Sequence, residues 1–83
     1  RLSNTTSITP LEIEVSEKCR LIGKTIGEVS FWQHTGATIV GIKHSGNTIL
    51  SPGPYATFKS GDILLVIGDE TVYEAVKIFL EEE

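Results

Sequence analysis

The sequence predicts a small α+β domain with its elements in the order β-α-β-β-β-α. Three observations support this class. An apolar–acidic alternation near the start is typical of a half-buried strand, β-branched and apolar runs in the middle indicate three further strands, and a final apolar stripe has the period of a helix. With 83 residues, 40% of them apolar and 22% charged, the chain is expected to form one folded domain.

The first predicted strand covers residues 11–15, Leu-Glu-Ile-Glu-Val. Because successive strand side chains face opposite sides, its apolar residues are expected inside and its glutamates in water. Residues 1–10 are rich in Ser, Thr and Asn and end in a proline, which is typical of a linker from a preceding domain. The folded domain is therefore predicted to cover residues 11–83.

A short helix is expected from the region of Thr25 to about His34. Thr25 and Glu28 match a capping box, in which each side chain accepts a hydrogen bond from the other residue's amide. Gly36 is expected to end the helix in the left-handed conformation. The predicted buried stripe contains Ile26, Val29 and either Trp32 or Gln33.

The middle of the chain predicts a β-hairpin of residues 38–43 and 48–50, joined by a turn at 44–47. Two prolines in residues 51–54 cannot donate to a ladder, so pairing should stop there. The strand at 63–67 is apolar at every position, so it is expected to be central or to be covered by a second subunit. A homodimer follows from this surplus of apolar surface.

The last predicted element is a helix capped by Asp69. Its apolar residues recur at helical spacing and should face the core. They are Val72, Ala75, Val76, Phe79 and Leu80.

Composition excludes several classes of function. The formal net charge of −4 disfavours a nucleic-acid polymer as partner. The longest apolar run has five residues, far short of the ~20 that span a bilayer. A single cysteine, Cys19, and two histidines give no zinc framework. Because no nucleophile elbow or phosphate loop is present, we do not expect an enzyme.

The two histidines each have a structural and a functional interpretation. His34 is expected at a helix C-terminus, where an imidazolium interacts well with the helix dipole. His44 follows Lys43 at the hairpin tip. It is either a solvated turn residue or a ring that contacts a planar ligand.

Four segments occur in a characteristic order: residues 21–28 (LIGKTIGE), 35–43 (TGATIVGIK), 51–54 (SPGP) and 59–68 (KSGDILLVIG). Together they resemble the C-terminal RCK domain, also called TrkA-C, over about residues 11–80. The resemblance implies a dimeric cytoplasmic regulatory domain. Such domains are attached to or associated with a bacterial inner-membrane potassium channel, potassium uptake protein or cation/proton antiporter.

The resemblance also implies a ligand, because some bacterial members bind cyclic di-AMP in a cleft between two such domains. Apolar side chains would hold the adenines, and Lys43 and His44 are the nearest candidates for the phosphates. The positions implied for the cleft are Ile26, Thr38, Ile39, Lys43, His44, Thr48, Ile49, Leu50 and Pro52. No other cofactor is expected, and the implied partners are a second copy, a membrane transport subunit or domain of the same system, and this small nucleotide.

Two hypotheses for function follow. In the first, the domain is a sensor that binds cyclic di-AMP and controls K⁺ or Na⁺/H⁺ transport. In the second, it is a ligand-free dimerisation module of the same system, which the apolar positions explain equally well. An ion sensor using Glu12, Glu14 or Asp62 is disfavoured because these acids are scattered. An ACT-type amino-acid-binding domain would need a strand after the last helix.

Overall fold

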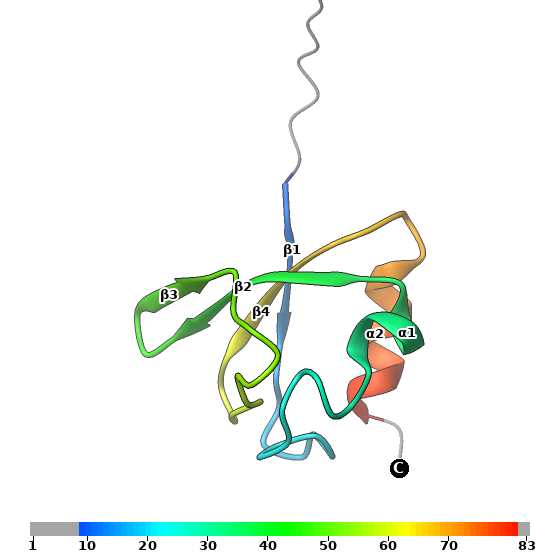
Figure 1. Ribbon diagram of the computed structural model, residues 1–83. Helices are drawn as coiled ribbons and strands as arrows, with labels where there is room; N and C mark the ends of the chain where they lie inside the picture. The colour runs from blue at the N-terminus through cyan, green and yellow to red at the C-terminus, as the bar shows by residue number, and fades with distance from the viewer. Residues whose placement is uncertain (1–8, 82–83) are drawn as a thin grey trace, which may run out of the picture.

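The computed structural model describes residues 9–81, in which a four-stranded sheet carries two helices on one face (Figure 1). The predicted α+β class and element order are confirmed. The linker predicted for residues 1–10 lies almost wholly outside the described residues. No helix within residues 9–81 is long and apolar enough to cross a bilayer. The elements are β1 (Leu11–Glu14), α1 (Phe31–Thr35), β2 (Thr38–His44), β3 (Asn47–Leu50), β4 (Ile63–Ile67) and α2 (Val72–Glu81).

The sheet is antiparallel throughout and has the strand order β1-β4-β2-β3. The two-sided apolar strand β4 is therefore central, as its sequence predicts. Leu64 and Val66 are fully buried on the face covered by the helices. The alternate residues Ile63, Leu65 and Ile67 are only half-buried on the opposite face. The chain thus leaves an incompletely covered apolar strip on its outer sheet face.

Strand β1 follows the predicted alternation in part. Ile13 and the following Val15 are buried, whereas Leu11 at the start of the strand is 40% exposed. Leu11 is the first residue of β1 and pairs with Val66 near the end of β4, so its side chain lies at the rim of the core.

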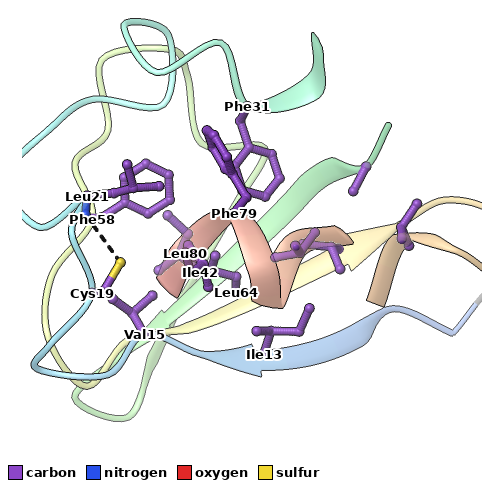
Figure 2. Close-up of a cluster of buried hydrophobic side chains, with 14 residues drawn as sticks. Ile13, Val15, Cys19, Leu21, Phe31, Ile42, Phe58, Leu64, Phe79 and Leu80 are labelled. Carbon is purple, nitrogen blue, oxygen red and sulfur yellow. Dashed lines mark hydrogen bonds between the residues drawn. The ribbon is translucent and has the colours of Figure 1, made fainter. Parts of the chain in front are cut away.

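The core lies between the sheet and the helices and is organised around the chain's three phenylalanines (Figure 2). The Phe31 ring centroid lies 6.1 Å from that of Phe58 and 6.0 Å from that of Phe79, distances typical of favourable aromatic pairs. Cys19 is buried in this core, and its sulfur accepts a hydrogen bond from the Leu21 amide at 3.4 Å.

The predicted capping box forms, but the predicted helix does not follow it directly. The Thr25 amide donates to Glu28 Oε1 at 2.9 Å, and the Glu28 amide donates to Thr25 Oγ1 at 3.1 Å. Residues 26–30 form turns, and Ser30 has a left-handed φ of 53°. A left-handed residue breaks the helical path, so α1 begins only at Phe31.

The late start of α1 changes which side chains are buried. Phe31 and Thr35 face the core, whereas Trp32 is 62% exposed and Gln33 is exposed too, so the last member of the predicted stripe is wrong. The other two members, Ile26 and Val29, are half-buried and pack against the core from the turns before the helix. The predicted end is confirmed. Gly36 has a φ of 75°, and its amide donates to the Trp32 carbonyl at 2.8 Å.

The helix predicted after Asp69 is confirmed as α2. Asp69 Oδ1 accepts hydrogen bonds from the Thr71 amide at 2.9 Å and from the Thr71 hydroxyl at 2.6 Å, which fixes the turn before the helix. The predicted stripe faces the core, with Ala75 half-buried and the other members buried. They are Val72, Val76, Phe79 and Leu80.

We expect Val76→Asp to unfold the domain. Val76 is fully buried in the middle of α2. An unpaired buried carboxylate costs several kcal/mol, against a total stability of about 5–15 kcal/mol. Ile78→Asp is the matched control, because it places the same group on the same helix at a position that is 57% exposed. Thermal unfolding followed by circular dichroism tests the pair, and equal midpoints would show that α2 does not pack as described.

Stability should fall on acidification through two surface carboxylates. Hydrogen bonds from the Thr25 amide and hydroxyl lower the pKa of Glu28 from its ordinary 4.5. Hydrogen bonds from the Thr71 hydroxyl and amide lower the pKa of Asp69 from its ordinary 3.8. Both ionised groups therefore stabilise the folded state above their ordinary pKa values, and this contribution disappears as the pH falls through the lowered ones.

The double variant Glu28→Gln, Asp69→Asn should therefore lose less stability than the wild type between neutral and strongly acidic pH. Urea unfolding at a series of pH values measures this difference. Two parallel pH profiles would contradict it.

Candidate ligand-binding site

Most of the positions predicted for the ligand cleft lie on the β2–β3 hairpin. Ser45 and Gly46 at its tip have φ values of 51° and 84°. Positive φ at both central residues is typical of the two-residue hairpin turn whose twist matches that of the strands. Strand β3 pairs only with β2 and is exposed along its whole length, with Ile49 54% and Leu50 73% exposed. The hairpin therefore forms a free edge of the sheet.

The pairing register divides the hairpin residues between the two faces of the sheet. Ile39 pairs with Val66, and Ile42 pairs with Ile49, which places Ile39 and Ile49 on the helix-covered face.

The alternate hairpin residues lie on the other face. Lys43 pairs with Thr48, and Gly41 pairs with Leu50, which places Lys43, Thr48 and Leu50 on the outer face. One copy of the chain thus does not bring all the predicted residues into one cleft.

The register shifts between Ile39 and Gly41, where Val40 forms a β-bulge in β2. The Val40 carbonyl accepts a hydrogen bond from the Ser51 amide at 2.9 Å, at the point where the chain leaves β3. The bulge therefore joins the middle of β2 to the loop that carries Pro52.

The apolar positions Ile26, Ile39 and Pro52 are half-buried, and the two isoleucines pack against the core. Gly27 brings the turn after Ile26 against the proline loop. Its amide donates to the Pro54 carbonyl at 2.8 Å, and a Cβ at this position would lie 3.0 Å from Pro54 Cβ. Only glycine permits this approach without a shift of the loop.

The polar positions of the predicted cleft are more exposed. Thr38 is exposed at the start of β2, opposite Ile67. Lys43 Nζ forms an ion pair with Glu12 Oε2 at 2.9 Å across the outer face, with both side chains about half exposed. Lys43 and Thr48 line a hollow of about 460 Å³ at the hairpin turn. Its other lining residues are Ser45, Gly46, Gly61 and Ile63.

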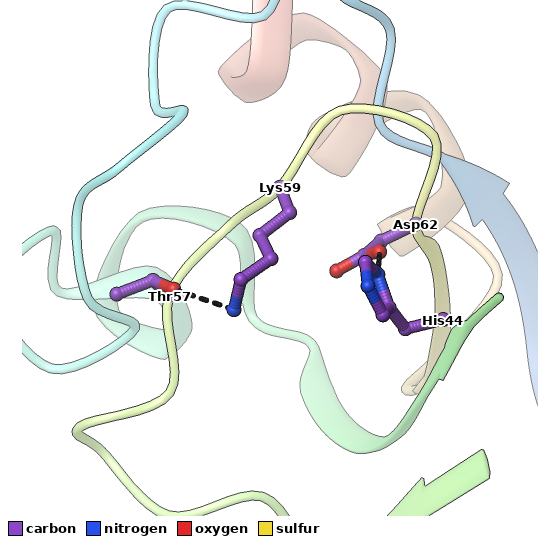
Figure 3. Close-up of polar contacts among 4 residues, drawn as sticks. All are labelled: His44, Thr57, Lys59 and Asp62. Carbon is purple, nitrogen blue, oxygen red and sulfur yellow. Dashed lines mark hydrogen bonds and ion pairs between the residues drawn. The ribbon is translucent and has the colours of Figure 1, made fainter. Parts of the chain in front are cut away.

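His44 is not a free turn residue, because its Nδ1 contacts the carboxylate of Asp62 (Figure 3). Asp62 is 3% exposed and lies in the turn before β4, whereas the His44 side chain is 46% exposed. Lys59 in the same turn donates to Thr57 Oγ1 at 3.1 Å and does not reach this pair (Figure 3). A buried carboxylate thus orients the imidazole and leaves Nε2 free for another contact.

The Asp62–His44 pair could not be read from the sequence, because the two residues are separated by 18 positions. The only signal is an acid directly before an apolar strand. A hollow of about 540 Å³ between β1 and α2 is also not predicted; Ile13, Tyr73, Lys77 and Leu80 are among its lining residues. Within the described part of the chain, no group of three or more His, Cys, Asp or Glu residues could hold a metal.

Comparison with known proteins gives a family match. The model of the TrkA-C domain family matches residues 11–80. No curated protein matches the chain.

Several solved structures resemble the chain. The RCK_C domain dimer of S. agalactiae BusR in complex with c-di-AMP has 46% identity and a TM-score of 0.83, covering 88% of this chain and 90% of that chain. S. agalactiae BusR in complex with its busAB-promotor DNA has 44% identity and a TM-score of 0.85, covering 96% of this chain but 39% of that chain. The RCK C domain of the potassium transport protein KtrA in complex with c-di-AMP has 30% identity and a TM-score of 0.68, covering 77% and 73%.

These structures correct one prediction. The acidic charge predicts no nucleic-acid polymer among the partners, and this is wrong, because the BusR relatives were solved in complex with promoter DNA. The partner present in these complexes is promoter DNA, whereas the resemblance implies a membrane transport subunit or domain. The charge argument fails because a net charge of −4 describes 83 residues only, whereas this chain spans 39% of the BusR chain in that complex.

We expect His44→Ala to lower the free energy of unfolding by about 1–3 kcal/mol, because it leaves the buried Asp62 carboxylate without this partner. Asn47→Ala is the control, since Asn47 is exposed and lies directly opposite His44 on β3. Asp62→Asn should then cost less in the His44→Ala background than in the wild type. Urea unfolding of the four variants of this cycle measures the coupling, and equal costs in both backgrounds would contradict the pairing.

Proposed function

The chain belongs to the TrkA-C (RCK_C) domain family, and from this premise we propose that it is a regulatory domain that binds cyclic di-AMP between the two copies of a homodimer. The observation that carries the proposal is the similarity to the BusR RCK_C dimer in complex with c-di-AMP, which extends over most of both chains. The alternative is a ligand-free dimerisation module.

The surface of the domain supports a dimer. The free edge strand β3 exposes Ile49 and Leu50, and the outer face of β4 is only half covered. A second copy would cover part of this apolar surface, which a chain of this size cannot bury alone. A cleft between two copies can also combine residues from both faces of the sheet, which one copy keeps apart.

The symmetry of the ligand supports a site on the dimer axis. Cyclic di-AMP has two-fold symmetry, so a symmetric cleft can use each contact twice. In this proposal the apolar surfaces of Ile26, Ile39, Ile49, Leu50 and Pro52 contact the adenines. The backbone near Thr38 and Ile39 supplies donors and acceptors for the base edges.

Two basic side chains would serve the phosphates. Lys43 would exchange its ion pair with Glu12 for a phosphate oxygen, at a modest cost because both groups are half exposed. His44 would donate from Nε2 as an imidazolium, since Nδ1 already donates to the Asp62 carboxylate. Thr48 lies beside Lys43 and can donate its hydroxyl to the same phosphate.

The output that we favour for the longer protein is control of DNA binding, because the similarity to BusR, at 42–46% identity, exceeds that to KtrA, at 30%. Control of K⁺ or Na⁺/H⁺ transport is the second candidate and is supported by the KtrA similarity. Both outputs go with a cytoplasmic location. In either case the ligand acts only through its difference in affinity between two states of the protein. Promoter-DNA binding by the complete gene product, with and without cyclic di-AMP, separates the two outputs.

Calorimetric titration of the domain with cyclic di-AMP should give one ligand per dimer. Ile39→Ala should weaken binding about thirtyfold, because a loss of about 1 kcal/mol counts twice in a symmetric site. Ile78→Ala is the matched control, as Ile78 is exposed on α2, outside the proposed site. Lys43→Ala should have a smaller effect that shrinks further at high salt.

Sedimentation velocity at micromolar concentration supplies the protomer count, and circular dichroism confirms that Ile39→Ala is folded. Two ligands per dimer, or full affinity in folded Ile39→Ala, would contradict the placement of the site. A folded dimer that gives no heat would support the ligand-free module, and a 9.1 kDa species alone would contradict the homodimer.

A further inference from the structure

A second hollow, apart from the proposed nucleotide cleft, gathers basic side chains beside helix α2. It measures about 260 Å³ and shares no residue with the cleft. Its basic members come from two segments: Arg20 and Lys24 from the loop after β1, and His34 from α1. The lining residues are Arg20, Leu21, Lys24, Glu28, Val29, His34 and Phe79.

Arg20 is held in a fixed position at this hollow. Its Nε donates to the Phe79 carbonyl at 3.1 Å, and its guanidinium carbon lies 4.8 Å from the centroid of the Phe79 ring. Its backbone amide also donates to the Leu80 carbonyl at 3.3 Å. The two terminal nitrogens are the donors that remain for a ligand. A guanidinium that is already ordered loses little entropy when it binds an oxyanion.

His34 is held by the same aromatic ring. Its imidazole stacks on Phe79 with a centroid distance of 4.9 Å and an interplanar angle of 13°. Its Nδ1 lies 3.0 Å from the Ser30 carbonyl oxygen, which can only accept, so Nδ1 donates. When the imidazole is protonated, Nε2 is a second donor. Phe79 is 7% exposed, so this platform for both basic groups is itself anchored in the core.

The hollow is lined by more basic than acidic residues, whereas the chain as a whole is acidic. The chain carries 7 Lys and Arg against 11 Asp and Glu, yet two of these basic residues and a histidine line this hollow with one acid, Glu28, among the described residues. Glu28 directs Oε1 at the amide and hydroxyl of Thr25. The Lys24 carbonyl accepts a hydrogen bond from the Phe58 amide at 3.0 Å, which fixes the backbone of this lining residue beside the hollow.

We propose that this hollow is a binding site for one phosphate group of an anionic ligand, with Arg20 as the bidentate donor and Lys24 and His34 as flanking donors. The planar guanidinium fork matches two oxygens of a tetrahedral oxyanion, and charge-assisted hydrogen bonds of this kind are the stronger ones. The buried Leu21 and Phe79 form an apolar floor that limits the water around these donors.

The site is tested by titrating the domain with orthophosphate at constant ionic strength, followed by the amide resonances of residues around the hollow. Lys24→Gln should weaken binding about fivefold or more, an effect of about 1 kcal/mol. Glu28→Gln should strengthen it by a similar factor, because it removes the acid yet keeps a residue suited to the capping box. Arg20→Lys keeps the charge but loses the fork, and should weaken binding as much as Lys24→Gln.

Lys18→Gln is the matched control, because it removes the same charge from a lysine that lines the groove between β1 and α2. It should change phosphate affinity less than twofold, or about 0.4 kcal/mol. If Lys18→Gln and Lys24→Gln weakened phosphate binding equally, the loss of net positive charge alone would explain the effect, and the proposal would be overturned. Shifts that do not saturate would overturn it too.

Two further measurements identify the source of the phosphate and distinguish this site from the nucleotide cleft. If a nucleic-acid backbone supplies the phosphate, Lys24→Gln will weaken binding of a short duplex DNA by the complete gene product more than Lys18→Gln does. If a small ligand supplies it, orthophosphate binding alone will respond. Cyclic di-AMP affinity should be unchanged in Lys24→Gln, and a matching loss of both affinities would merge the two sites and overturn the assignment.

Discussion

The contact of Phe31, Phe58 and Phe79 holds together parts of the chain that have little regular structure to join them. Phe31 opens the short helix α1, Phe58 lies in an irregular segment, and Phe79 comes from α2. The segment around Phe58 pairs with residues 22–25 through two isolated bridges only. Loss of the aromatic contact would therefore free α1, the loop after β1 and the proline loop at once. Both the turn that presents Ile26 and the basic hollow depend on these segments.

The sheet presents a contrasting situation, because its central strands are paired on both sides while the edge strand β3 exposes large apolar side chains. Strand β4 is paired on both sides, and β3 has a partner on one side only. An open edge with large exposed apolar side chains is a liability unless another chain covers it. The division of the hairpin residues between two faces has the same consequence, since only an arrangement of two copies can bring both sets to one ligand. The open edge, the exposed apolar surface and the divided candidate site thus all require a second copy of the chain to be completed.

The sequence was sufficient where periodicity governs the structure. The alternation in β1, the two-sided strand β4 and the stripe of α2 were all predicted, because each depends on burial at regular spacing. The start of α1 was not, because the positive φ of Ser30 leaves no trace in residue type. The exposure of Trp32 followed from the same error.

The candidate site was predicted in composition more than in arrangement. Lys43 and His44 could be assigned to the hairpin because they are neighbours in the segment that predicts it. Their partners Glu12 and Asp62 lie 31 and 18 positions away, and such contacts are set by the sheet order, which a single sequence does not state. The basic hollow was missed for the same reason, because its cations come from two separate segments, and Arg20 and His34 meet on the ring of Phe79.

The bulge at Val40 means that β2 changes phase in its middle. The extra residue shifts the alternation of inward and outward side chains after the bulge by one position relative to that before it. Ile39 and Ile42 therefore share a face although they are three positions apart. One extra residue therefore determines which face of the sheet each side chain of the hairpin tip occupies. During divergence, side-chain changes along the tip can accumulate one at a time. A change of length at this point would instead exchange the tip's apolar and charged sides in a single step. We therefore expect the length of this strand to be under stronger selection than the identity of its exposed residues.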